Sequence, residues 1–140
     1  SLLMAMRHFN PTFHFIAPEE LKMPEEYKIY CREHDIRFVE HTDFTEEIIA
    51  DADILYMTRV QKERFFNEED YVRLKDFYIL TAKKMKLAPP DMLVLHPLPR
   101  VNEISVDVDD DPRAVYFKQV QYAVYVRMAL ILTLLNIHVD

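Results

Sequence analysis

The sequence has 140 residues, half of them hydrophobic, a formal net charge of −7, one cysteine and no glycine. This length and apolar content are typical of one globular domain, whereas the negative charge disfavours binding to nucleic acid or to an anionic membrane surface. The single cysteine excludes a disulfide framework within the chain and favours a reducing, cytoplasmic setting, and the lack of glycine excludes the glycine-rich loops that bind nucleotide phosphates.

The first third of the chain predicts short helices around two strands. Prolines at positions 18 and 24 each precede two glutamates, a pattern typical of a first helical turn. Thr42 is a candidate helix cap. In chain order, the predicted elements are a helix over residues 2–9, a strand over 13–17, a helix start at Pro18, a helix from Pro24 to His34, a strand over 36–40 and a helix over 43–50.

The rest of the chain continues the alternation of strands and helices. Asn67 is a candidate cap, and Ala88-Pro89-Pro90 marks a stop. The predicted elements are a strand over residues 53–57, a polar segment over 58–66, helices over 68–74 and 81–87, a strand over 92–95, an acidic loop over 101–111 and a long helix from Pro112 to Leu135.

The strands are apolar throughout, which indicates that both faces are buried, as in a parallel sheet. Strands that alternate with helices predict an α/β fold in which helices flank this sheet. No internal linker is visible, so residues 1–140 are predicted to form a single domain. The longest apolar stretch, residues 123–135, is interrupted by Arg127 and is shorter than the roughly 20 residues of a membrane span.

Two polar segments follow predicted strands, TRVQKER over residues 58–64 and HPLPR over residues 96–100. Ligands of open parallel sheets bind beyond the carboxyl ends of the strands. The two segments gather cations and an amide in an acidic protein: Arg59, Gln61, Lys62, Arg64 and Arg100. Guanidinium groups suit carboxylates and phosphates, so the residues predict an anionic small-molecule substrate. The alternatives are a solvated loop for the first segment and a rigid turn for the second.

Other candidate sites are weaker. The six histidines show no metal-binding spacing, so no metal ligand is assigned. Residues 107–111 are acidic, but carboxylates also favour the start of a helix, and a solvated loop is the simpler interpretation. Cys31 lies within a predicted helix and is expected to be a core residue.

Several stretches together resemble the catalytic chain of aspartate carbamoyltransferases. They are FIAPEELKMP over residues 15–24, ADILYMTRVQKERF over 52–65, VLHPLPRVNEI over 94–104 and YFKQVQYAVYVRMALILTLL over 116–135, with the acidic loop between the last two. The resemblance covers essentially the whole chain. It implies a Rossmann-like aspartate-binding domain, and a reaction in which the amino group of L-aspartate attacks carbamoyl phosphate to give N-carbamoyl-L-aspartate and phosphate in pyrimidine biosynthesis. It implies no metal and no cofactor.

The resemblance also implies roles for particular residues. Arg59 clamps the side-chain carboxylate of aspartate and Gln61 helps to hold the same substrate. The backbone carbonyls of Pro97 and Leu98 accept hydrogen bonds from the carbamoyl amide and the attacking amine, next to a cis Leu98–Pro99 bond. The remaining residues belong to loops that shift as two domains close, in ion-pair roles: Lys62, Glu63, Arg64 and Arg100.

The chain departs from the family pattern in two places. The family has a first domain that binds carbamoyl phosphate, and its motif GRTVHS ends where this chain begins, at Ser1. A partial domain lacking its first strand, and inactive alone, is therefore expected. Around residues 120–123 many relatives have glycine where this chain reads VQYA. The resemblance implies a trimer of catalytic chains in the whole enzyme, with a possible regulatory chain.

Two alternatives stay open. An ornithine-type carbamoyltransferase is the nearest other enzyme, although that group has cysteine in the place of Pro97 and lacks the TRVQ signature. A non-catalytic interaction module that pairs with other chains through its apolar last helix is the alternative from a different class.

Overall fold

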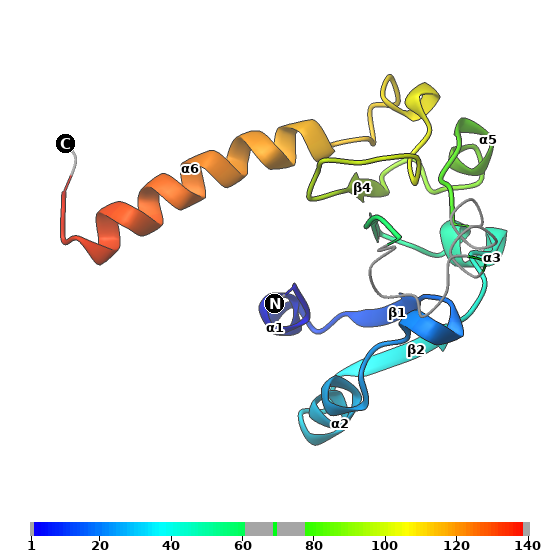
Figure 1. Ribbon diagram of the computed structural model, residues 1–140, viewed down its shortest axis with the longest axis horizontal. Coiled ribbons are helices and arrows are strands. Elements are labelled where there is room, and N and C mark those ends of the chain that lie inside the picture. Colours follow the sequence, from blue (N-terminus) through cyan, green and yellow to red (C-terminus); the bar gives the residue numbers. More distant parts are fainter. Residues whose placement is uncertain (1, 61–68, 70–77, 139–140) are drawn as a thin grey trace. The chain divides into compact units, whose positions relative to one another are not determined.

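The computed structural model describes residues 2–60, 69 and 78–138. The chain divides into two compact units, Ser1–Thr45 with Gln61–Tyr78, and Glu46–Val60 with Ile79–Asp140. Each unit contains a pair of parallel strands accompanied by helices, which confirms the predicted α/β class (Figure 1). Among the described residues, the strands form two parallel two-stranded sheets, one in each unit.

The first unit is built around the strands β1, Thr12–Ile16, and β2, Arg37–His41. They pair in parallel, from Thr12 opposite Arg37 to Ile16 opposite His41. The helical elements are α1 (Leu2–Met6), η1 (Arg7–Phe9), η2 (Glu19–Leu21) and α2 (Glu25–Glu33). Helix α2 packs against β2 and buries Cys31 completely, as expected for a core cysteine.

The second unit is built around β3, Ile54–Tyr56, and β4, Leu93–Leu95, which also pair in parallel. Two isolated parallel bridges, Leu80 with Ile104 and Val94 with Ala114, extend the backbone pairing. Its helical elements are α3 (Glu46–Ala50), α5 (Ala82–Met85), η4 (Val106–Val108) and α6 (Tyr116–Leu134). The fully buried apolar side chains of this unit are Ile49, Leu80, Met85, Met92, Val94, Ile104, Val108 and Tyr116.

Two predicted helix starts are wrong. Helix α3 begins at Glu46 and not at residue 43, because Phe44 is buried and the carbonyl of Thr42 accepts a hydrogen bond from the Tyr78 hydroxyl. Helix α6 begins at Tyr116 and not at Pro112. The residues just before it bond to β4 instead, with Val94 N donating to Arg113 O and Val115 N to Val94 O. The predicted helix over 68–74 lies outside the described residues, except for position 69.

Helix α6 is mostly exposed beyond its first turn. Its large exposed apolar side chains are Phe117, Tyr122, Val124, Tyr125, Val126, Met128, Leu130, Ile131 and Leu134. Of the helices in the described part of the chain, none combines the length and the apolar character needed to cross a membrane.

Candidate functional site

The parallel pairing of β3 and β4 brings two predicted site segments to one edge of the second unit. Tyr56, the last residue of β3, pairs with Leu95, the last residue of β4, and Met57 N donates to Leu95 O at 2.8 Å. Residues 58–60, including the exposed Arg59, and the turn 96–100 therefore leave the sheet at the same carboxyl edge. The other candidates in the first segment lie outside the described residues: Gln61, Lys62, Glu63 and Arg64.

The turn 96–100 has an unusual backbone. Leu98 adopts a left-handed conformation, with φ of 48°, and the Leu98–Pro99 peptide bond is cis, which confirms that expectation. Prolines carry no N–H, so the turn presents more acceptors than donors. Among the described residues, no donor is bonded to the carbonyl oxygen of Pro97 or Leu98. The described part of the chain thus leaves these two acceptors unpaired.

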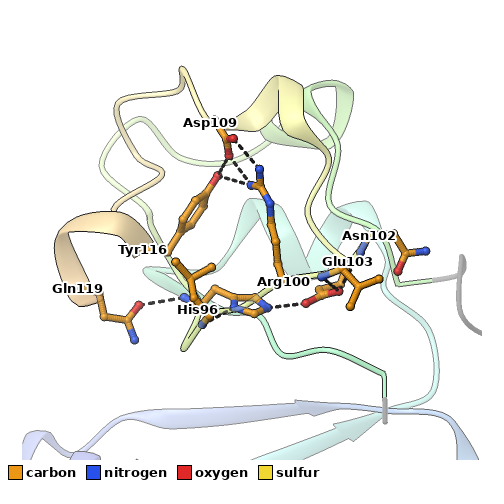
Figure 2. A network of polar contacts seen from close by, with 9 residues as sticks. His96, Arg100, Asn102, Glu103, Asp109, Tyr116 and Gln119 are labelled. Carbon is orange, nitrogen blue, oxygen red and sulfur yellow. Dashed lines mark hydrogen bonds and ion pairs between the residues drawn. The ribbon is translucent and has the colours of Figure 1, made fainter. Parts of the chain in front are cut away.

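His96 and Glu103 form a buried pair beneath this turn (Figure 2). Their side chains are 1% and 2% exposed, and His96 Nε2 lies 2.6 Å from Glu103 Oε1. Glu103 Oε2 accepts hydrogen bonds from the backbone N–H groups of Val101 and Asn102, both at 3.1 Å. His96 N donates to the side-chain oxygen of Gln119 in α6 at 2.9 Å. The pair therefore links the end of β4, the turn and the following loop.

The environment keeps Glu103 ionised. Burial alone raises the pKa of a carboxyl group, but the backbone N–H donors and His96 outweigh it, so the pKa of Glu103 is lowered. A carboxylate in this position accepts on both oxygens. It can therefore orient the His96 ring and the backbone of residues 101–102 at once.

Arg100 is held on the other side of the turn. Both of its terminal nitrogens donate to the carboxylate of Asp109, with Nη2 at 2.5 Å from Oδ2, and Nη1 lies 3.1 Å from the Tyr116 hydroxyl oxygen. The Tyr116 hydroxyl also donates to Asp109 (Figure 2). The hydrogen bond from Arg100 lowers the pKa of Asp109, and burial together with Asp109 raises the pKa of Tyr116 to about 12. Arg100 is therefore paired inside the second unit.

Sequence reasoning found the two segments but missed the residues that hold the turn. His96 was one of six histidines without a metal-binding pattern, and Asp109 stood in an acidic run that suggested a solvated loop. A polar residue placed directly after a buried strand was the available signal for His96. Within residues 2–60, 69 and 78–138, no three His, Cys, Asp or Glu side chains come together in a way that could hold a metal ion.

Comparison with known proteins identifies close relatives. The aspartate carbamoyltransferase catalytic subunit of Bacteroides fragilis is 66% identical over 137 residues, which cover 98% of this chain and 44% of that subunit. The corresponding subunit of Finegoldia magna is 61% identical over 138 residues, covering 98% of this chain and 45% of that subunit. The chain thus spans less than half the length of the curated relatives that it matches.

Solved structures share the fold. Aspartate transcarbamoylase from Trypanosoma cruzi in complex with N-(phosphonacetyl)-L-aspartic acid is 34% identical, with a TM-score of 0.80, covering 93% of this chain and 42% of that chain. The catalytic subunit of M. jannaschii aspartate transcarbamoylase is 37% identical, with a TM-score of 0.80, covering 89% of this chain and 41% of that chain. The family model for the aspartate/ornithine carbamoyltransferase Asp/Orn-binding domain matches residues 1–134. The chain therefore belongs to the aspartate/ornithine carbamoyltransferase family and represents its Asp/Orn-binding domain.

Proposed function

We propose that this chain is the aspartate-binding part of an aspartate carbamoyltransferase. The whole enzyme would transfer the carbamoyl group of carbamoyl phosphate to the amino group of L-aspartate, forming N-carbamoyl-L-aspartate for pyrimidine biosynthesis. The observation that carries the proposal is the common edge of β3 and β4, where the segment with Arg59 and the carbonyl-rich turn 96–100 leave adjacent parallel strands. The names of the close relatives support the same reaction.

The chemistry of this edge suits aspartate. The Arg59 guanidinium would pair with the side-chain carboxylate through two parallel hydrogen bonds. The carbonyl oxygen of Pro97 would accept a hydrogen bond from the carbamoyl amide, and that of Leu98 would accept one from the amino group of aspartate. Holding both reactants in this way converts a reaction between two separate molecules into one between positioned groups. Gln61 is proposed as a second contact to aspartate.

The other assigned residues would shape the site without touching the reacting atoms. Lys62, Glu63 and Arg64 are proposed to make ion pairs as the loop closes over the substrates. Arg100 would shape the site by itself, because its pairing with Asp109 fixes the chain immediately after the turn.

The remainder of the enzyme is also part of the proposal. Carbamoyl phosphate would bind a separate N-terminal domain, the catalytic chains would form a homotrimer, and a regulatory chain could join them. This chain alone would be inactive, because it holds only the aspartate side of the reaction. A cytoplasmic location is proposed from the single, buried cysteine.

A non-catalytic interaction module is the second candidate, favoured by the exposed apolar side chains of α6. Large exposed apolar surfaces often mark sites of protein contact. A module of this kind has no use for Arg59 and the turn together. An ornithine-type activity is the other alternative, against which the proline at position 97 argues.

A chimera tests the proposal directly. In the Bacteroides fragilis catalytic subunit, this chain replaces the matching 137 residues. Transfer of the carbamoyl group from carbamoyl phosphate is then assayed with L-aspartate and, in parallel, with L-ornithine, and the carbamoylated product of each amino acid is measured. We expect aspartate-dependent activity. Turnover of ornithine instead supports the ornithine-type alternative, and a folded chimera without either activity contradicts the proposal.

An Arg59→Ala change in the active chimera tests the assigned role. Loss of a charge-assisted pair with the substrate carboxylate raises KM for aspartate by about tenfold or more, because such bonds contribute about 1.5–3 kcal/mol. The matched control is Arg32→Ala, which removes an exposed arginine of α2 that is not part of the proposed site. Equal KM values for the two variants contradict the role of Arg59.

A further inference from the structure

Within the proposed substrate turn, a side chain bonds directly to the backbone. Leu98 N donates to Nδ1 of His96 at 2.8 Å. The Leu98 N–H and the Pro97 carbonyl belong to the same planar peptide group, so fixing the direction of one fixes the direction of the other. In a trans peptide the two bonds point to opposite sides. The N–H aimed at His96 therefore directs the Pro97 carbonyl oxygen away from His96.

The hydrogen bonds also assign the proton on the imidazole ring. Nδ1 accepts from Leu98 N–H, so it carries the lone pair, and Nε2 carries the proton and donates it to Glu103. Glu103 cannot take the donor role in its bond to Nε2, because an ionised carboxylate only accepts hydrogen bonds. Its second oxygen already accepts from the N–H groups of Val101 and Asn102. A carboxylate therefore fixes the tautomer of a histidine, as carboxylates do for metal-binding and catalytic histidines.

We propose that His96, oriented by Glu103, is a positioning residue that aims the Pro97 carbonyl at the amide group of carbamoyl phosphate. This inference rests on the proposed function and names residues that the family resemblance did not assign. The order of contacts is Glu103 to His96, His96 to the Leu98 N–H, and through the peptide plane to the Pro97 carbonyl. His96 does not touch substrate in this scheme, since it is 1% exposed beneath the turn.

The first test measures the proton position in the unmodified chain. Labelling histidine with ¹⁵N gives distinct NMR signals for protonated and unprotonated ring nitrogens. At pH 7 we expect His96 to be protonated on Nε2 and unprotonated on Nδ1. Protonation on Nδ1, or on both nitrogens, removes the acceptor for Leu98 N–H and overturns the proposal whatever the enzyme does.

The second test uses two replacements that each keep one half of the histidine's contacts. In His96→Asn, the amide oxygen takes the place of Nδ1 and can still accept from Leu98 N–H, but the bond to Glu103 is lost. In His96→Gln, the amide nitrogen reaches the position of Nε2 and can still donate to Glu103, but Leu98 N–H loses its acceptor. Both variants are made in the active chimera, and their thermal stabilities are measured alongside their kinetics.

We expect kcat for aspartate to be about tenfold lower in His96→Gln than in His96→Asn, the factor that one hydrogen bond of about 1.4 kcal/mol represents. The loss falls on kcat more than on KM for aspartate, because the misdirected carbonyl disturbs the carbamoyl group and not the contacts of the aspartate carboxylate. Equal kcat values, or activities that follow the order of the melting temperatures, overturn the proposal. An inactive unmodified chimera instead removes the proposed function, and this inference with it.

Discussion

One polar pair from each unit shows how far the surroundings of similar contacts can differ. In the first, Arg32 and Glu25 of α2 lie 2.8 Å apart, and both side chains are 57% exposed. In the second, His96 and Glu103 lie 2.6 Å apart but are 1% and 2% exposed, and Arg113 is 16% exposed. Pairs at similar distances therefore contribute differently to stability, because water competes for the exposed pair and cannot replace a lost partner in the buried one. Burial, more than bond length, should rank the effects of mutation.

The largest effect is expected for Glu103→Ala. This change leaves the His96 N–H and two backbone N–H groups without their acceptor in a buried place. A buried donor left without its acceptor costs about 1–3 kcal/mol, so the three together should cost about 3–5 kcal/mol. Urea unfolding of the chain, followed by circular dichroism, measures the change in the free energy of unfolding. A loss below about 1 kcal/mol, which is the range of an exposed pair, would show that the buried pair does not differ from the exposed one.

Arg113→Met comes next. The guanidinium bonds both carboxylate oxygens of Asp111 and the carbonyls of Met85, Ala88 and Pro89. It thereby ties the end of α5 to the segment before α6. Methionine keeps the apolar stem but none of the donors, so we expect a loss of about 2–4 kcal/mol in the same unfolding experiment.

Arg113→Lys is the matched control, since it keeps the charge. One ammonium group has three donors and lacks the planar fork. Lysine should therefore recover only part of the stability. Full recovery would show that charge alone, and not the set of bonds to carbonyl oxygens, accounts for the role of Arg113.

A smaller effect is expected in the pH dependence of the free energy of unfolding. The pKa of Glu103 is lowered in the folded state, so its contribution is complete above the ordinary glutamate pKa of 4.5 and is lost as the pH falls through the lowered value. Glu103→Gln removes this titration, so below pH 4.5 its free energy of unfolding should fall less steeply than that of the parent. Identical slopes for variant and parent would contradict a folded-state pKa below the ordinary one.

The sequence predicted the order of elements well, because apolar strands and proline-marked helix starts are local signals. It failed where distant contacts compete with those signals. Pro112 suggested a helix start, but the residues that follow bond to β4 and delay the helix to Tyr116. A parallel sheet was predicted and the pairing is parallel, but periodicity does not indicate which strand pairs with which.

In the candidate site, too, some features could be predicted from the sequence and others could not. Arg59 and the turn 96–100 could be placed together because each follows a predicted parallel strand. The pairing of His96 with Glu103 could not be predicted, because they lie seven positions apart in irregular backbone and no periodicity relates their side chains. Arg100 was expected in an ion-pair role, but its partners in the folded unit, Asp109 and Tyr116, could not be named from the sequence.

The smallest effect is expected for Arg32→Ala in the first unit. Arg32 donates to Glu25 and also lies over the ring of Phe38, with 5.8 Å between the guanidinium carbon and the ring centroid. Both ion-pair partners are more than half exposed, so water and salt replace most of what is lost. We expect unfolding curves that coincide with those of the parent, at both low and high salt. A clear shift of the unfolding curve at low salt that disappears at high salt would show that the exposed pair contributes to stability. The exposed and the buried pair would then differ only in the size of their contributions.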